Sequence, residues 1–347
     1  MPEQTDSASS QHSGPDVFLA GHVFLDLIFT GLAAAPPPGT EVFTLGLGTA
    51  PGGIANLAVA MSRLGLSVSL ATVYGDDLYG EFLHQVVSEQ EQVDLSRSRQ
   101  LANWSTPVTV SMAFGGDRSM ISYREPMPLE LDDLVDDPPP ARACFIHIDQ
   151  PPPQWIRKMR ERGTLVFADL GWDDTGVWAS TVLDRLAMVD VFVPNDAEAM
   201  AYTRTGTPEE ALDVLVQKVD TVAVKCGARG VVAASRSTSE RVEVRALPVL
   251  AIDPTGAGDV FAAALVVARR QNWSLAQQVD FANLCAGLSV RHHSGSLGAP
   301  CWHDIAEWLV GAGAEMRERY SYLLPILPDV HEVDRARAMP TLRAPVR

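Results

Sequence analysis

Short apolar runs alternate with helix-like segments through the second half of the chain. Four runs are predominantly apolar, and they occupy residues 144–148, 164–168, 191–193 and 221–225. Such runs are typical of strands that are buried on both faces of a sheet. Two segments between them, 154–162 and 208–219, carry apolar residues at helical spacing. The alternation of strand and helix predicts an α/β fold with a parallel sheet covered on both faces.

The first part of the chain repeats this pattern. An apolar run over 17–23 predicts the first strand, and residues 68–73 predict a second one. A helix between them is predicted by apolar residues at helical spacing, namely Ile54, Leu57, Met61 and Leu64. Because ligands of parallel sheets bind beyond the carboxyl ends of the strands, polar residues that follow these strands are candidates for a site.

Two segments depart from the alternation. Residues 41–47 form a short strand-like piece after a proline-rich turn. Val108, Val110, Met112 and Phe114 alternate with small or polar residues and lead through a glycine turn into Ile121 and Tyr123. This pattern predicts a hairpin. It is either an ordinary edge hairpin or part of a small sheet that forms a lid over the active site.

Composition and charge narrow the class of protein. The chain has 347 residues, enough for a large core, and a formal net charge of −16, which argues against nucleic acid or an anionic membrane as a partner. No apolar run is long enough to span a membrane, and residues 1–15 are typical of a disordered leader rather than a secretory signal. Four cysteines without CxxC spacing indicate a reduced, cytoplasmic setting. Residues 313–347 are expected to form a C-terminal tail.

The most informative motif is Asp253-Pro-Thr-Gly-Ala-Gly-Asp259, followed by an apolar helix. The backbone amides of Gly256, Ala257 and Gly258 would point into one concavity at the helix N-terminus, an arrangement that binds phosphate. Asp259 would then take a proton from an attacking hydroxyl while the amides hold the transferring phosphoryl group. The alternative is a plain helix start with an acidic first turn.

Together with a second motif, this run resembles a known family. Gly52-Gly-Ile-Ala-Asn56 lies about 200 residues before it and leads into the first predicted helix. Both motifs, in this order, resemble those of the ribokinase-like (PfkB) carbohydrate kinases. The resemblance covers residues 16–312 and implies a three-layer sandwich with a mostly parallel central sheet. It also implies a small β-sheet lid, with segments near 24–50 and 105–126.

The resemblance assigns the sugar-binding residues. Gly52 and Gly53 would let a sugar approach the backbone closely. Asn56 would project toward sugar hydroxyls from the first turn of the helix. Asp26, after the first strand, matches the substrate-binding aspartate of the family; the alternative is a turn residue.

Asn195 and Glu198 match the Asn-x-x-Glu motif of the family. At the end of a strand they would organise Mg²⁺, directly or through water, because Mg²⁺ prefers hard oxygen ligands and keeps several waters. The alternative is a capping box at a helix start.

The nucleotide site is expected at Lys225-Cys-Gly227-Ala-Arg-Gly230, where relatives bind the nucleotide phosphates. Lys225 stands where many relatives have threonine, and it would bind phosphate as a point charge. Asn283 falls near the adenine pocket by the same resemblance. A simple hairpin turn is the alternative for the glycines.

Two departures from the family pattern bear on the site. Some relatives carry Asp-Pro-Asn-x-Arg after a central strand, but this chain reads Asp169-Leu-Gly-Trp-Asp173 and lacks both the asparagine and the arginine. A phosphate clamp there is therefore in doubt, and substrates of the fructokinase and ketodeoxygluconate kinase type are less favoured. The cation loop at 295–300 also differs, so K⁺ at Asp253 and Thr255 is only a candidate.

These observations predict a kinase that uses ATP and Mg²⁺ to phosphorylate a hydroxymethyl group of a small sugar. A nucleoside kinase, or a non-catalytic sensor of sugar or nucleotide, is the alternative on the same scaffold. A homodimer formed through the lid is a candidate assembly.

Overall fold

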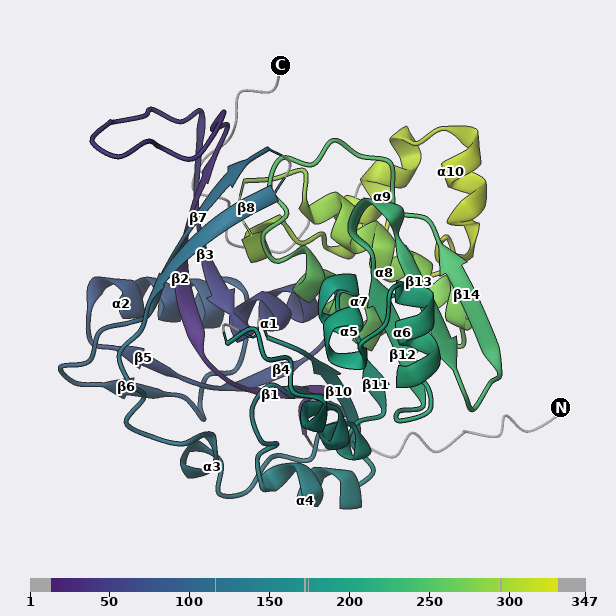
Figure 1. Ribbon diagram of the computed structural model, residues 1–347, viewed down its shortest axis with the longest axis horizontal. Helices are drawn as coiled ribbons and strands as arrows, with labels where there is room; N and C mark the ends of the chain where they lie inside the picture. The colour runs from purple at the N-terminus through teal and green to yellow at the C-terminus, as the bar shows by residue number, and fades with distance from the viewer. Residues whose placement is uncertain (1–13, 116, 172, 174, 294, 330–347) are drawn as a thin grey trace, which may run out of the picture.

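An eight-stranded sheet forms the centre of the molecule in the computed structural model, which describes residues 14–115, 117–171, 173, 175–293 and 295–329 (Figure 1). The strands are β1 (Val17–Ala20), β4 (Val68–Ala71), β9 (Ala143–His147), β10 (Leu165–Asp169), β11 (Val191–Phe192), β12 (Thr221–Lys225), β13 (Val231–Ser235) and β14 (Glu240–Val244). Their order is β14-β13-β12-β11-β10-β9-β1-β4. The pairs β12–β13 and β13–β14 are antiparallel and the other five pairs are parallel, so the predicted mostly parallel sheet is confirmed.

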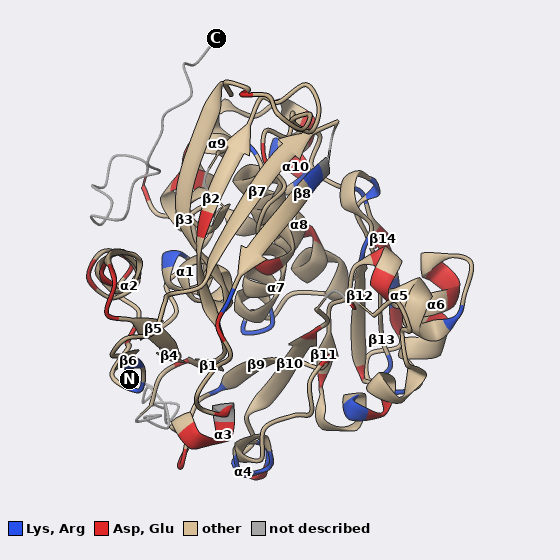
Figure 2. Cartoon of the chain, turned by 60° about the vertical axis from the view of Figure 1, so that its left-hand side comes forward, with Lys and Arg blue, Asp and Glu red and all other residues tan. Residues whose placement is uncertain are grey.

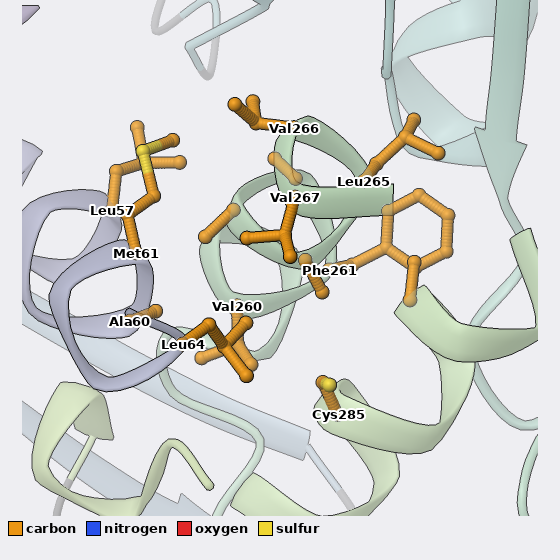
Figure 3. Packing of buried hydrophobic residues seen from close by; sticks show 14 of the residues in the cluster. Leu57, Ala60, Met61, Leu64, Val260, Phe261, Leu265, Val266, Val267 and Cys285 are labelled. Carbon is orange, nitrogen blue, oxygen red and sulfur yellow. The ribbon is translucent and has the colours of Figure 1, made fainter. Parts of the chain in front are cut away.

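Helices cover both faces of this sheet. One hydrophobic cluster contains side chains of α1 (Ile54–Arg63), α7 (Ala257–Ala268), α8 (Leu275–Ser289) and α9 (Trp302–Gly311). The other contains side chains of α4 (Trp155–Glu161), α5 (Asp196–Thr203) and α6 (Pro208–Leu215). In Figure 3, Ala60 of α1 and Leu64, which follows this helix, lie next to Val260 of α7. Successive residues of β1 enter opposite clusters, Leu19 one and Phe18 the other, as a doubly covered strand requires. The predicted three-layer sandwich is confirmed.

A separate four-stranded sheet, called the lid sheet below, has the order β3-β2-β7-β8. Its strands are β2 (Val23–Thr30), β3 (Gly46–Gly53), β7 (Val108–Phe114) and β8 (Asp117–Tyr123). The predicted hairpin is present as β7 and β8. Buried Ser111 of β7 lies 3.1 Å from Thr255, Oγ to Oγ1, so one face of the lid sheet contacts the start of α7.

Smaller elements complete the fold. They are the sheet of β5 (Val73–Gly75) and β6 (Arg99–Leu101), the helices α2 (Leu78–His84), α3 (Leu131–Leu134) and α10 (Ala314–Arg319), and the short helical turns Gln85–Gln90, Ser180–Met188, Gly227–Arg229, Gly295–Gly298 and Ser321–Leu323. Throughout the described ranges, every helix is too short or too polar to cross a membrane.

Two strand predictions near the lid sheet were wrong. The run 17–23 is not one strand, because the chain leaves the central sheet after Ala20 and enters β2 at Val23. The strand expected at 41–47 begins only at Gly46 and continues to Gly53. Because β3 contains several glycines, it shows no apolar alternation in the sequence. They are needed there because a Cβ on Gly52 would lie 2.2 Å from the Asp26 carboxylate.

The ends of the chain are described only in part. The expected leader lies outside the described residues apart from 14 and 15, and so do residues 330–347 of the expected tail. Residues 313–329, by contrast, pack on the core: Tyr320 and Leu323 are fully buried, and Arg319 pairs with Asp280 of α8 at 2.5 Å. Packing therefore continues beyond residue 312.

Candidate active site

The start of α7 has the geometry of an anion site. The chain enters the helix through Gly256, whose φ of 76° lies in the left-handed region that favours glycine. The amide of Ala257 donates to the Pro254 carbonyl at 3.2 Å, so the turn already uses this donor. The amides of Gly256 and Gly258 are therefore better placed to bind an anion than that of Ala257.

Asp259 lies in the first turn of α7 and contacts the first motif. Asn56 Nδ2, in the first turn of α1, donates to Asp259 Oδ2 at 2.9 Å, which joins two motifs 203 residues apart. Burial raises the pKa of Asp259, although the charges of Lys225 and His147 and the bond from Asn56 oppose this shift. A raised pKa makes the carboxylate a stronger base, as general-base catalysis requires. Asn56 Oδ1 is buried and has no hydrogen-bond partner among the described residues.

Asp26 faces the same space from the lid sheet. Its side chain lies on β2 beside Gly52, and the residue is 6% exposed. Burial, together with the nearby carboxylates of Asp259 and Asp253, raises the pKa of Asp26 to about 8, against the opposing charge of Arg118. At neutral pH Asp26 thus carries a proton, which it can donate to an oxygen. The other glycine of this motif, Gly53, has a φ of 62° and ends β3 where α1 begins.

A compact charged cluster lies at the carboxyl ends of β10 and β12. Lys225 Nζ pairs with Asp169 Oδ2 at 2.5 Å. Burial lowers the pKa of Lys225, but Asp169, Glu198 and Asp259 raise it further, so the net shift is upward and the ammonium stays charged. The expected phosphate ligand is thus held by a carboxylate.

Asn195 and Glu198 form the capping box that was the alternative to a metal site. Asn195 Oδ1 accepts from the amide of Glu198 at 2.8 Å, and Glu198 Oε2 accepts from the amide of Asn195 at 3.2 Å. Burial and the neighbouring Asp169 raise the pKa of Glu198 to about 7, against the opposing charge of Lys225. The described residues contain no group of three His, Cys, Asp or Glu side chains placed to bind a metal directly. The donor set therefore suits hydrated Mg²⁺ held through water better than a closed metal cage.

The remaining nucleotide candidates lie along β13 and β14. Gly227 and Gly230 flank the short turn between β12 and β13, and both have positive φ, 55° and 107°. A Cβ on Gly230 would lie 2.0 Å from the Val244 carbonyl. Asn283 Nδ2 donates to that same carbonyl at 3.3 Å, so Asn283 and Gly230 are neighbours.

Asp253 and Thr255 are both buried just before α7. Asp253 Oδ1 accepts from the amide of Thr255 at 2.9 Å. Its Oδ2 is buried and has no hydrogen-bond partner in the described part of the chain. An unsatisfied buried carboxylate oxygen is a fitting ligand for a cation.

Sequence reasoning missed three ionisable residues of this site. Asp169 was considered only as the start of a missing motif, His147 ends β9 close enough to affect Asp259, and Arg118 lies on β8 close enough to affect Asp26. A usable signal existed for Asp169 and His147, because each is a polar residue at the carboxyl end of a parallel strand.

Comparison with known proteins agrees with this geometry. The model of the pfkB family carbohydrate kinases matches residues 16–301. The 2-dehydro-3-deoxygluconokinase of Bacillus subtilis (strain 168) is 26% identical over 290 residues, which cover 78% of this chain and 89% of that protein.

Two solved structures share the fold. Arabidopsis thaliana ribokinase complexed with ribose and ATP superposes with a TM-score of 0.66 at 22% identity, covering 84% of this chain and 98% of that one. A putative ribokinase II in complex with ATP and Mg²⁺ from E. coli gives a TM-score of 0.68 at 20% identity, with 86% and 99% covered. This chain belongs to the pfkB family of carbohydrate kinases and is a sugar kinase that transfers phosphate to an alcohol group.

Proposed function

We propose that this enzyme transfers the γ-phosphoryl group of ATP to a hydroxymethyl group of a small sugar, with Asp259 as the general base. The observation that carries the proposal is the position of Asn56. Its Nδ2 holds Asp259, while its buried Oδ1 lacks a partner among the described residues. A sugar hydroxyl that donates to Oδ1 would lie beside the base, and Asp26 would bind a second hydroxyl.

In the reaction, Asp259 accepts the proton of the attacking hydroxyl. The hydroxyl oxygen forms a bond to the γ-phosphorus, and the bond to the bridging oxygen breaks as ADP leaves. The amides of Gly256 and Gly258 stabilise the charge that develops on the phosphoryl oxygens, with Ala257 completing the turn. Asn195 and Glu198 would hold hydrated Mg²⁺, which neutralises phosphate charge when it is bound. Lys225, Gly227, Gly230 and Asn283 would form the nucleotide side.

The lid sheet supports a free sugar over a nucleoside. A nucleoside base needs an apolar or stacking wall, and Met112, Phe114 and Tyr123 of the hairpin are the side chains that could supply it. They lie on the face of the lid sheet opposite to Ser111, which contacts Thr255. Phe24 is the aromatic residue of β2 on the Asp26 face, and it packs beside Gly53.

The outer face of the lid sheet is apolar and partly exposed, and the lid strands carry little charge (Figure 2). Phe29, Val110, Met112 and Ile121 belong to this face, and Ile121 is 66% exposed. A second copy of the chain covering this face is therefore proposed, and Ile121→Glu should convert a dimer to a monomer in sedimentation.

Two further expectations are kept as proposals. K⁺ at Asp253 and Thr255 is proposed on the unsatisfied Asp253 oxygen. A cytoplasmic location is proposed on the four free cysteines.

The test of function measures ADP release with ATP, Mg²⁺ and a panel of pentoses, hexoses, sugar acids and nucleosides. We expect turnover with a free sugar and a further rise when K⁺ replaces a large organic cation. Turnover of adenosine with none of any sugar would establish the nucleoside kinase. Tight binding of a sugar without turnover would establish a sensor.

A further inference from the structure

The Lys225–Asp169 pair is more than a structural link between two strands. Resting on the proposed kinase function, we infer that Lys225 is a catalytic residue that binds the transferring phosphoryl group, and that Asp169 is the positioning residue that aims it. The two side chains are 14% and 9% exposed, and they lie at the carboxyl ends of β12 and β10 with β11 between them.

The first argument is the place of the ammonium group. Lys225 Nζ lies 3.2 Å from the position that a Cβ on Gly258 would take. Gly258 therefore leaves room for this cation beside the first turn of α7. A phosphoryl group bound by the amides of that turn would lie next to the Lys225 ammonium, where a fixed positive charge stabilises the transition state.

The second argument is the count of donors. An ammonium group has three N–H donors, and Asp169 is the only acceptor that Lys225 has among the described residues. The buried Arg63–Glu91 pair is different, because Arg63 also donates hydrogen bonds to the carbonyls of Leu297 and Ala299. The guanidinium of Arg63 thus ties elements together, whereas Lys225 keeps donors for a ligand.

The third argument is the missing clamp. Family members with Asp-Pro-Asn-x-Arg carry an arginine four residues after the aspartate, but this chain has Asp173 at that position. Lys225 brings a cation to the same end of the sheet from β12, two strands away. Asp169 holds the direction of the Lys225 side chain through its bond to Nζ. The same pairing offsets the cost of burying the ammonium group.

The experiment compares Lys225→Met, Lys225→Arg and Asp169→Asn with a matched control. The control is Lys218→Met, which removes another lysine–aspartate pair, Lys218–Asp184, at 3.6 Å and 39% and 74% exposure. For each variant, calorimetry measures the affinity for ADP and for a non-hydrolysable ATP analogue, and steady-state assays separate kcat from KM for the sugar.

For Lys225→Met we expect kcat to fall about 10²- to 10³-fold, the range for loss of one preorganised donor, with the KM for sugar unchanged. Affinity for the ATP analogue should fall about tenfold and affinity for ADP should not, because only the analogue carries the γ-phosphate. Lys225→Arg should restore part of kcat, and Asp169→Asn should lower kcat while ADP still binds. The control should match the wild type.

Wild-type kcat in Lys225→Met, or equal losses of ADP and analogue affinity, would overturn the inference. If Lys225→Met does not fold, Lys225→Arg alone decides. The inference expects this variant to have a lower kcat and a lower selectivity for the analogue over ADP than the wild type, whereas a purely structural pair predicts wild-type selectivity. If the wild type phosphorylates nothing, the proposed function fails. The selectivity for the analogue over ADP still tests Lys225 in that case.

Discussion

The two sides of the candidate site are built differently. On the phosphate side, charged groups stand at the ends of strands in a sheet that is buried on both faces, and neighbours hold each of them. Lys225 is paired with Asp169, and Glu198 is bound in a capping box. On the sugar side, Asp26 projects from a four-stranded sheet whose other face is partly exposed. In the proposed function, the doubly covered sheet would position the chemistry, whereas the lid sheet, with one partly exposed face, would present the groups that select the substrate.

This contrast predicts that changes on the phosphate side lower kcat, and that changes on the sugar side alter KM and sugar selectivity. The first three predictions below test this division, and the fourth tests the protonation of Asp26 on the sugar side.

The largest effect is expected for Asp259→Asn, which keeps the size of the side chain and the bond from Asn56 but removes the proton acceptor. We expect kcat to fall by about 10²-fold or more, within the range of general-base catalysis, while ATP affinity measured by calorimetry changes little. Near wild-type turnover in this variant would show that Asp259 is an ordinary helix-start residue.

Asp26→Ala should act on binding. Loss of this bond would leave a buried sugar hydroxyl without its partner, at a cost of about 1–3 kcal/mol, so sugar affinity should weaken about 5- to 150-fold. ATP affinity should remain. Tyr123→Ala, on the outer face of the same sheet, is the matched control and should leave both affinities intact. Equal weakening in both variants would mean that Asp26 acts only through the stability of the lid sheet.

Glu198→Gln should raise the Mg²⁺ concentration for half-maximal activity several-fold, with the KM for sugar nearly unchanged. The reason is that an amide oxygen is a weaker ligand and water acceptor than a carboxylate. Titration of activity with Mg²⁺ measures this effect. An unchanged Mg²⁺ response combined with a lower melting temperature would leave Glu198 with its capping role alone.

The smallest effect concerns stability and pH. The pKa of Asp26 is about 8 in the folded protein, above the ordinary value near 4 of an unfolded chain. Between these values the folded protein keeps a proton that the unfolded chain has lost, so the free energy of unfolding falls as pH rises. Asp26→Asn removes this dependence. Its melting temperature relative to wild type should therefore rise by a few degrees from pH 5 to pH 8; no change across that range would contradict the shift.

The sequence alone was enough for the local features of this protein. Strands buried on both faces are continuous apolar runs, so the runs at 164–168 and 221–225 could be recognised as β10 and β12 with end errors of at most a residue. The helix start at Gly256–Asp259 is likewise local, because the turn needs glycine at a positive φ. Two motifs in order were enough to predict the family.

Only the tertiary structure determines which residues that are distant in the sequence come into contact. The bond from Asn56 to Asp259 spans 203 positions, and the pair of Lys225 with Asp169 spans 56, so no periodicity along the chain could indicate either. The glycines of β3 show no strand pattern, because their need for space arises from Asp26 on the neighbouring strand. The face on which Met112 and Tyr123 lie depends on how the lid sheet docks on α7. The chemistry of each side chain follows from the identity of that residue, whereas side-chain contacts and strand register depend on the packing of the whole fold.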